Sequence, residues 1–333
     1  MTLKDIAELA GVSSAAVSMV LNNKPGISQK KRQEILNLLQ KYHYGPFKNM
    51  PAAAKGFLFL KFIKNGFLVE ENTGFVAAIL DSVEAECRKY GYTLRIEISH
   101  NALDDTLQNI DFSLLSGIFV LGTELDSTTY PLLDRIPVPY VVIDNRMPHF
   151  PCNSITMNNH EMVYTAVSHL ATLGFKNIGY LKSQMSIQNF EDRSQAFYDA
   201  CQKFNLTCAP EHVFHLEPTL LGSYADMKRY CSTEGFSLPP CAFADNDTIA
   251  IGAMKALTEL GYQIPASLRV IGFDDIMFSA VNSPSLSTMQ VQKALIGKQA
   301  VKLLTQAISD HELTDCKQLI GGRLIIRNST DIS

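Results

Sequence analysis

The chain has 333 residues, of which 46% are hydrophobic and 19% charged, and its formal net charge is −4. A chain of this length favours two or three domains, and the composition is ordinary for a globular protein with a full core. It contains no apolar run of about 18 residues, so it predicts no membrane span. Asp5 and Glu8 interrupt the N-terminal stretch, which therefore does not resemble a secretory signal peptide. We expect a cytoplasmic protein with no membrane partner.

Charge is unevenly divided along the chain. Residues 1–48 carry seven basic and three acidic side chains, a net charge of +4, which leaves −8 on the remainder. A small basic segment ahead of a larger acidic body is consistent with a segment that meets phosphates. The seven cysteines are scattered and the eight histidines do not cluster, so we expect free thiols, no metal site and no cofactor.

The first 22 residues predict two short helices joined by a tight turn. Thr2 and Asp5 are three residues apart, so the threonine can cap the first helix while the carboxylate lies in its first turn. Gly11 ends this helix because glycine readily takes a left-handed turn conformation, and Ser13 caps the second. The apolar faces are Leu3, Ile6, Ala7 and Ala10, then Ala16, Val17, Val20 and Leu21. Helices this short are unstable alone, and the pair is typical of a helix-turn-helix whose second helix enters a DNA major groove.

Beyond this pair, residues 28–42 predict a third helix that begins after a Ser28 cap, and Pro46 and Pro51 bracket a linker. From residue 57 the pattern alternates between short apolar strands and amphipathic helices, which is typical of parallel sheets covered on both faces. The expected strands are 57–63, 93–98, 117–121, 140–143, 177–181, 241–244 and 269–272. The expected helices are 74–90, 159–173, 191–204, 221–233, 247–260 and 292–309.

About 270 residues of this alternating pattern exceed one open sheet of ordinary size. We therefore predict a small all-α helix-turn-helix domain followed by an α/β core of two doubly wound parallel-sheet lobes. In such a core the ligand cleft lies between the lobes, near the carboxyl ends of the strands. The sequence contains no phosphate-binding loop, dinucleotide-binding turn, serine elbow or paired catalytic groups, so we predict no enzyme and no catalytic residues.

Several segments along the chain resemble those of one family. The head contains LKDIAELAGVS, AAVSMVLNN and ISQKKRQEIL, which resemble the DNA-binding head of LacI/GalR-type bacterial transcription regulators. The body contains IPVPYVVIDNR, SHLATLGFKNIGY, ADNDTIAIGAMKAL and VIGFDD, which resemble the periplasmic-binding-protein-like core of the same family. Because these segments occur in the family's order along nearly the whole chain, the sequence is identified as a member of this family.

The resemblance implies a homodimeric transcriptional regulator, expected to be a repressor, that binds double-stranded operator DNA and a small effector. It also implies three crossings between the lobes, which we place near residues 156, 288 and 319. The expected domains are a DNA-binding head, a linker or hinge, an N-terminal lobe and a C-terminal lobe. Their residues are 1–46, 47–56, 57–156 with 288–318, and 157–287 with 319–333, respectively.

The resemblance places the DNA contacts on the second helix of the head and beside it. The base-reading residues are Ser14, Ala15 and Met19, and the phosphate-contacting residues are Ser13, Ser18, Asn22 and Ser28. Many relatives have arginine where this chain has Met19, so a bidentate contact to guanine is lost and direct readout is weaker or different. Two alternatives stay open: Met19 packs inward, and the hydroxyl and amide side chains serve only as caps or meet solvent.

The linker departs from the family pattern. Relatives carry an Ala-Arg-Ser-Leu stretch whose leucine wedges into the minor groove, whereas this chain has Ala53 near that position. We therefore do not expect a standard hinge helix. Either the operator is bent only weakly, or Met50 acts as the wedge.

The resemblance also places six effector contacts in the cleft, namely Arg193, Asp274, Asn246, Phe75, Asp144 and Asn189. An arginine fork and a carboxylate can each hold two adjacent oxygens, so the expected effector is a carbohydrate. Three alternatives stay open: Arg193 forms a surface ion pair with Glu191 or Glu86, Asp274 is a turn residue, and Asn246 caps a helix. Residues 64–73 replace a loop common in relatives and are expected at the cleft mouth.

Other functions stay open beside a carbohydrate-controlled regulator. A nucleobase-responsive regulator would use the same cleft with a different effector. A cytosolic sugar-binding receptor is disfavoured by the helical head, and a nucleotide-dependent enzyme is disfavoured by the missing phosphate loop.

Overall fold

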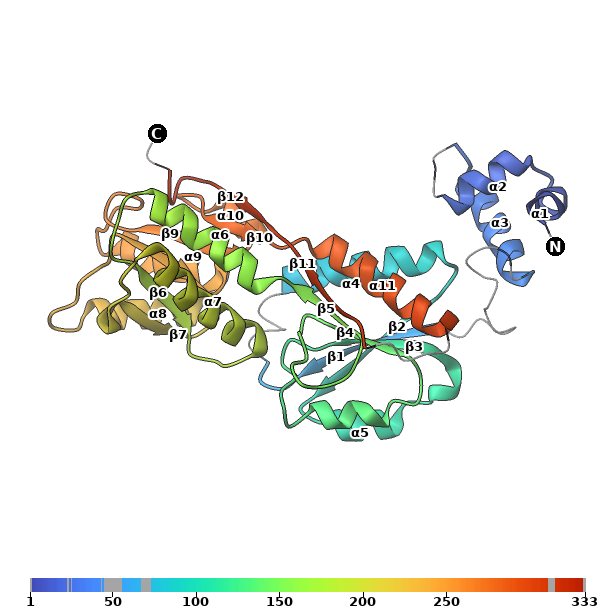
Figure 1. Cartoon of the computed structure of the whole chain (residues 1–333), viewed down its shortest axis with the longest axis horizontal. Helices are drawn as coiled ribbons and strands as arrows, with labels where there is room; N and C mark the ends of the chain where they lie inside the picture. Colours follow the sequence, from blue (N-terminus) through green and yellow to red (C-terminus); the bar gives the residue numbers. More distant parts are fainter. Residues whose placement is uncertain are drawn as a thin grey trace.

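The computed structural model describes residues 2–22, 24, 26–42, 44, 56–66, 73–310 and 315–331. The first of these residues form three helices, and those from residue 56 onward form two α/β lobes (Figure 1). The predicted linker lies outside the described residues up to residue 55, and with it Met50 and Ala53. The loop expected at the cleft mouth is described only at its ends.

The head is a bundle of three helices around a small apolar core, with the ends that the sequence predicted. The Thr2 hydroxyl accepts a hydrogen bond from the Asp5 amide at 3.3 Å, and the Asp5 carboxylate accepts one from the Thr2 amide at 2.7 Å. Gly11 has a φ of +61°, and the Ser13 hydroxyl caps the second helix. The helices are α1 (Leu3–Leu9), α2 (Ser14–Leu21) and α3 (Gln29–Lys41). The core side chains are Ile6, Ala7, Val17, Val20, Ile35 and Leu39.

The first lobe is built on a six-stranded parallel sheet in the order β11-β5-β4-β3-β1-β2. Helices α4 and α11 pack together on one face, and α5 and the 3-10 helix η3 cover the other (Figure 1). The strands are β1 (Gly56–Ile63), β2 (Leu94–His100), β3 (Leu115–Leu121), β4 (Tyr140–Ile143), β5 (Ser154–Met157) and β11 (Lys317–Ile320). The helices are α4 (Thr73–Lys89), α5 (Leu103–Asn109), η2 (Phe112–Leu114), η3 (Tyr130–Arg135) and α11 (Lys293–Asp310).

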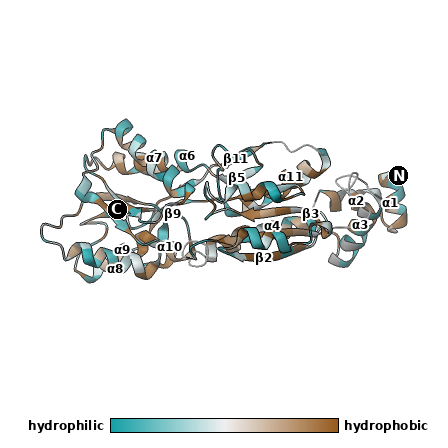
Figure 2. Ribbon diagram, turned by 90° about the horizontal axis from the view of Figure 1, so that it is seen from below, coloured by the Kyte–Doolittle hydropathy of each residue, from teal (hydrophilic) through white to brown (hydrophobic). Residues whose placement is uncertain are grey.

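The second lobe has a six-stranded sheet in the order β12-β10-β9-β8-β6-β7, parallel except that β12 runs antiparallel to β10. Helices α6 and α7 lie on one face, and α8 and α9 on the other (Figure 2). The strands are β6 (Gly179–Ser183), β7 (Val213–Leu216), β8 (Cys241–Ala244), β9 (Arg269–Asp274), β10 (Ser287–Gln290) and β12 (Arg323–Ile325). The helices are α6 (Asn159–Thr172), α7 (Gln188–Phe204), η4 (Pro210–His212), α8 (Leu220–Cys231), α9 (Asp247–Glu259) and α10 (Met277–Val281).

The chain passes between the two sheets three times, after β5, after β10 and after β11. The predicted crossings near 156, 288 and 319 each come one to two residues early. The reason is strand pairing, because β10 pairs with β9 as far as Gln290 and β11 pairs with β5 as far as Ile320. Residues 288–290 therefore belong to the second sheet, and residues 319–320 to the first.

Two further observations bear on the class of protein. Among the helices of the described segments, none is long and apolar enough to span a bilayer. The seven cysteines form no disulfide with one another. Burial raises the pKa of the Cys87 and Cys241 thiols to about 12, so both stay protonated and pack as small apolar side chains.

Candidate DNA-binding head and interlobe site

The predicted base-reading residues lie on the outer side of α2. Ser14 and Ala15 are exposed, whereas Met19 is half-buried. A Cβ placed on Gly26 would come within 2.8 Å of the Met19 Cε, so the end of the Met19 side chain rests on this glycine. The alternative that Met19 packs inward is therefore partly confirmed. The side chains on the exposed side of α2 are small and uncharged.

The predicted phosphate-contacting residues all take part in local hydrogen bonds. The hydroxyls of Ser13 and Ser28 accept from backbone amides three residues on, at 3.2 and 3.3 Å. The Asn22 amide donates to the Ser18 carbonyl at 2.9 Å and to its hydroxyl at 3.3 Å. Because a serine hydroxyl that accepts a hydrogen bond as a helix cap can still donate its own proton, capping and phosphate contact are compatible.

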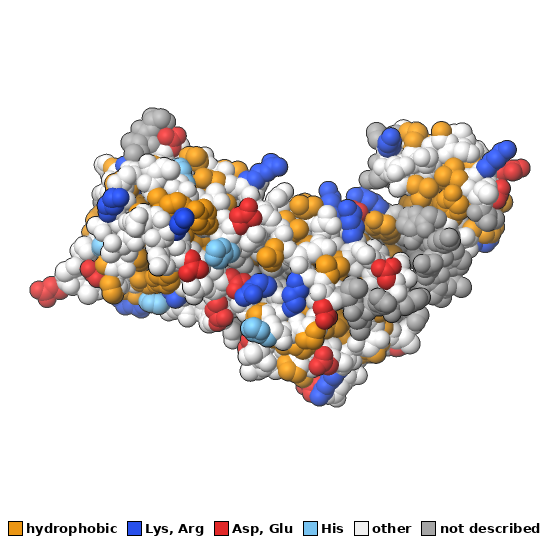
Figure 3. Space-filling model, in the orientation of Figure 1, with side chains coloured by type: hydrophobic (Ala, Val, Ile, Leu, Met, Phe, Trp, Pro, Cys, Tyr) orange, Lys and Arg blue, Asp and Glu red, His pale blue; other side chains and the backbone are white. Residues whose placement is uncertain are grey.

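On the face of the lobes shown in Figure 3, acidic and basic side chains are interspersed over the described surface.

All six predicted effector residues line one buried cavity between the lobes. Phe75 comes from α4 and Asp144 follows β4 in the first lobe; Asn189 and Arg193 come from α7, Asn246 precedes α9 and Asp274 ends β9 in the second. The cavity has a volume of about 30 Å³, room for on the order of two water molecules. The lobes are therefore closed on one another around these side chains.

Arg193 is the centre of the polar network in this cavity. Its Nε donates to the Asn159 Oδ1 at 2.8 Å, its Nη1 donates to the Asp245 carbonyl, and its Nη2 lies 3.6 Å from the Asp274 Oδ1. The guanidinium carbon also lies 3.7 Å from the centre of the Phe273 ring. Because the arginine side chain is only 4% exposed, the alternative of a surface ion pair is wrong.

Asp144 and Asn189 connect the two lobes inside the cavity. The Asn189 amide donates at 3.0 Å to both the carbonyl and the Oδ1 of Asp144, and the Thr123 hydroxyl donates to the Asp144 Oδ2 at 2.6 Å. Burial raises the pKa of Asp144 to about 6, although the Thr123 hydrogen bond opposes that rise. This carboxyl group therefore takes up a proton more readily than an exposed aspartate does.

Asn246 and Asp274 both line the cavity, and each also has the local role that was left open as an alternative. The Asn246 Oδ1 caps α9 by accepting from the Ile249 amide at 2.8 Å, while the residue also lines the cavity. Asp274 has a φ of +114° and Asp275 a φ of +52°, so the end of β9 is held in a conformation that L-residues rarely adopt. Lys293 donates to the carbonyls of both aspartates.

Other buried carboxylates behind the cavity were not singled out from the sequence. Asp245 accepts from the Tyr180 hydroxyl at 2.5 Å and from the Ser183 amide at 2.7 Å. Asp247 accepts at 2.6 Å from the hydroxyls of Ser279 and Thr288. Burial raises the pKa of Asp245 to about 6 and that of Asp247 to about 7. Both lie in the segment ADNDTIAIGAMKAL, and the resemblance of this segment to the family is the sequence feature that could have indicated them.

Comparison with known proteins decides the family. The model of the lacI family of bacterial regulatory proteins matches residues 2–46, and a periplasmic binding protein-like domain matches residues 167–330. The chain belongs to the LacI family. Among curated relatives, the HTH-type transcriptional repressor PurR of Mannheimia succiniciproducens is 29% identical over 335 residues and 98% of each chain. The protein of the same name from Haemophilus influenzae strain PittEE is 29% identical over 338 residues, again 98% of each chain.

Solved structures of LacI-type regulators share the fold. A complex titled transcriptional regulator CelR-cellobiose has a TM-score of 0.72 at 19% identity, covering 99% of each chain. A Lac repressor dimer bound to operator and the anti-inducer ONPF has a TM-score of 0.72 at 22% identity, with the same coverage. A LacI family regulator from Enterococcus faecium with bound ribose has a TM-score of 0.68 at 18% identity and covers 82% of this chain and 98% of its own.

Membership of the LacI family gives the general function. The protein is a DNA-binding transcriptional repressor with a helix-turn-helix head and a periplasmic-binding-protein-like core. Regulators of this family bind operator DNA and a small-molecule effector and act as dimers, and its relatives are regulators of transcription, not enzymes.

Proposed function

We propose that this LacI-family member is a cytoplasmic homodimer whose affinity for a two-fold operator is set by a small effector bound between the lobes. The observation that carries the proposal is the meeting of the six predicted contacts, drawn from both lobes, around one cavity. A cavity of about 30 Å³ is far smaller than the roughly 300–1,000 Å³ of pockets that enclose small molecules. Entry of an effector therefore requires the lobes to separate, which couples binding to a change of shape.

For the effector itself we propose a sugar or sugar derivative. Arg193 presents a planar fork of donors, and Asp144 and Asp274 present acceptors on opposite sides of the cavity. Donors and acceptors in this arrangement can hold neighbouring hydroxyl groups. The structures of relatives with cellobiose and with ribose support this class.

A nucleobase is the second candidate effector, and two aromatic rings favour it. Phe75 from α4 and Phe190 from α7 line the same cavity from opposite lobes. A planar base can stack on such rings while carboxylate and amide groups bond its edge. The sugar and nucleobase proposals differ in which contacts matter, since the second depends on the rings.

A thermal-shift screen of sugars, sugar phosphates and nucleobases on the full chain tests the effector class. The expected result is a dose-dependent rise in melting temperature with one class, abolished by Arg193→Met. Phe75→Leu should weaken a nucleobase strongly and a sugar little. A screen in which no compound of either class raises the melting temperature contradicts both proposals.

A gel-shift assay with DNA from the gene's own upstream region tests the DNA-binding proposal. We expect a sequence-specific, salt-sensitive complex that the active effector strengthens or weakens. Absence of a specific complex at low salt contradicts the proposal.

The proposed homodimer is supported by exposed apolar side chains on both lobes. In the first lobe, Ile96 and Ile98 are 53% and 47% exposed on the edge strand β2. In the second, Met277, Phe278 and Val281 are 76%, 52% and 71% exposed on the short helix α10. Apolar side chains gathered this way mark contact surfaces, and a two-fold dimer would bury both sets against their copies.

A further inference from the structure

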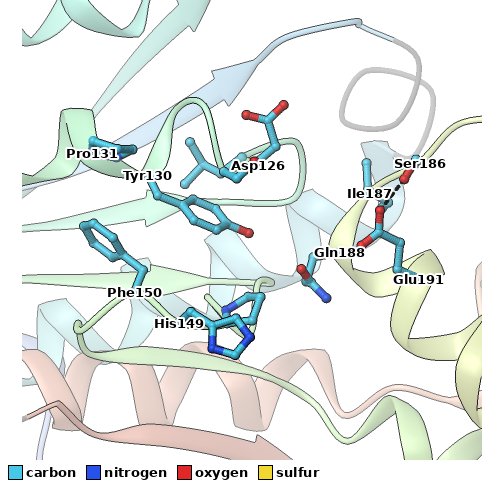
Figure 4. Close-up of a pocket in the computed structure, with 12 residues that line it drawn as sticks. Asp126, Tyr130, Pro131, His149, Phe150, Ser186, Ile187, Gln188 and Glu191 are labelled. Carbon is cyan, nitrogen blue, oxygen red and sulfur yellow. Dashed lines mark hydrogen bonds between the residues drawn. The ribbon is translucent and has the colours of Figure 1, made fainter.

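A second and larger chamber lies between the lobes, outside the buried cavity. Its volume is about 590 Å³, and it shares only Ile187 with the lining of the cavity. One wall comes from the first lobe, from residues 125–127, 130–131 and 148–150. The other comes from the second lobe, from residues 186–188 and Glu191 (Figure 4).

The wall on the first lobe is aromatic and held in place. The rings of Tyr130 and Phe150 lie 5.9 Å apart at 47°, and Tyr130 is buried. The Lys317 ammonium donates to the carbonyls of Met147 and Phe150, which fixes the loop that carries Phe150. Figure 4 shows the Tyr130 hydroxyl directed into the space between His149 and Gln188.

Carboxylates from both lobes lie in or beside the chamber. Burial raises the pKa of Tyr130, and the carboxylates of Asp126, Glu191 and Asp192 raise it further, while a hydrogen bond to Asn145 opposes them. No lysine or arginine is among the lining residues that the structure describes.

These carboxylates differ in whether a cation neutralises them. Asp126 pairs with Lys64 and Asp192 with Arg146. In the described part of the chain, the hydrogen-bond partner of the Glu191 carboxylate is the Ser186 hydroxyl, and no lysine or arginine lies within ion-pair distance. Of these three carboxylates, Glu191 is therefore the one that no described lysine or arginine neutralises, and it lies on the wall facing the two rings.

We propose that this chamber binds an organic cation, a primary ammonium group on an apolar body about the size of one ring. The ammonium group would face Glu191, and the apolar body would lie against Tyr130 and Phe150. The Glu191 carboxylate attracts a cation and repels an anion of the same size, while the two rings add apolar contact for the body of the ligand. This site adjoins the effector cavity at Ile187 but uses other side chains, and because both lobes line it, its ligand favours the closed arrangement.

Isothermal titration of the full chain with three matched probes tests the proposal. 2-Phenylethylamine, 2-phenylethanol and phenylacetate share one ring and differ in charge. The amine should bind saturably, the alcohol about threefold to tenfold more weakly, and the acid not at all. Equal binding of the three probes, or no saturable binding of the amine, overturns the proposal.

Variants then locate the bound amine. Glu191→Gln keeps an acceptor for Ser186 and should weaken the amine about threefold to tenfold without changing the alcohol. Glu211→Gln, which removes an exposed carboxylate outside the chamber, should change neither. Asp274→Asn, in the effector cavity, should leave amine binding unchanged. Loss of amine binding in Asp274→Asn, or none in Glu191→Gln, overturns the assignment to this chamber.

Discussion

Arg146 and Asp192 join the two lobes through two parallel hydrogen bonds. The Arg146 Nε donates to the Asp192 Oδ2 at 3.0 Å, and its Nη2 donates to the Oδ1 at 2.9 Å. Arg146 follows β4 in the first lobe and Asp192 lies in α7 of the second, where Gln188 also donates to it at 2.8 Å. The pair is a polar link between the two lobes, next to Glu191 of the chamber.

Breaking this pair should make the lobes easier to open. The Arg146 side chain is 44% exposed, so we expect Arg146→Ala to cost at most about 1 kcal/mol of folding free energy. If the effector requires open lobes to enter, the same variant should bind it up to about fivefold more tightly. The measurement is effector titration, with Arg135→Ala as control because it breaks an exposed pair within one lobe. Unchanged or weaker effector binding in Arg146→Ala contradicts the role of the pair.

Removing the buried arginine should have a larger effect. Arg193→Met leaves Asp274 and the Asp245 carbonyl without their cation, so we expect a loss of about 3–5 kcal/mol in unfolding free energy. Effector response should be lost as well. Denaturant unfolding measures the first effect and thermal shift the second. Arg135→Met, which breaks an exposed pair with Asp104, should lose less than about 1 kcal/mol; equal losses in both variants would contradict this account.

Stability should fall as pH rises through the range of the buried carboxylates. The pKa is about 6 for Asp144 and Asp245 and about 7 for Asp247, above the ordinary value of 3.8. The folded state thus binds protons more tightly than the unfolded state, so this contribution is complete below pH 3.8 and is lost as pH rises through 6 to 7. Urea unfolding at pH 5 and pH 8 should show the lower stability at pH 8.

The variant Asp247→Asn isolates one of these groups. Its amide can accept from Ser279 and the Ile276 amide on one side and donate to Thr288 on the other, so the hydrogen bonds can be kept. We expect the difference in unfolding free energy between the two pH values to shrink. Asp104→Asn, at an exposed carboxylate, should leave it unchanged. An undiminished difference in Asp247→Asn means that this carboxyl does not titrate as expected.

In the head, Gly26 should matter for DNA binding through Met19. Gly26 has a φ of +112°, and a Cβ there would lie 2.8 Å from the Met19 Cε. Gly26→Ala should cost about 1 kcal/mol or more of head stability and also displace Met19, lowering operator affinity. Gly11→Ala is the control, because a Cβ at Gly11 meets nothing within 4 Å although φ is +61°. Equal operator affinity in the two variants, at equal fraction folded, would exclude a role for the Met19 position.

A charge on the edge strand should separate the proposed dimer. Ile98→Lys places an ammonium group on β2 without disturbing a buried side chain, so folding should be kept while the interface is lost. Analytical ultracentrifugation should show monomers and gel shift a weaker complex. Leu260→Lys, at an equally exposed leucine after α9, should stay dimeric. A dimeric Ile98→Lys protein would place the interface elsewhere.

Local patterns in the sequence predicted much of this fold, whereas features that depend on contacts between distant residues could not be predicted. The Thr2 capping box, the Gly11 turn and the apolar strands could be predicted because neighbours within four residues determine them. The strand β5 was missed because SITM is short and half polar, and its place depends on pairing with β11 from the far end of the chain. Short strands of this kind are stabilised by neighbours, not by their own propensity.

The candidate site shows the same division. The family pattern indicated Arg193, but its burial against Phe273 and its bond to Asn159 depend on segments far apart in sequence. The ion pair between Arg146 and Asp192 could not be predicted from the sequence, because the two ordinary charged side chains lie 46 positions apart. The chamber could not be predicted either, because residues of both lobes line it and its shape depends on how the lobes meet.

The three crossings between the sheets have a consequence for how the core can be taken apart. A protease that cuts after β5, for example, would leave the lobes tethered by the backbone after β10 and after β11. Neither lobe is one continuous stretch of chain, so neither can be released as an intact fragment by a single cleavage. The three backbone connections also restrict how the lobes move relative to each other. The lobes can rotate about the connections, but a twist or slide of one lobe against the other would stretch at least one connection.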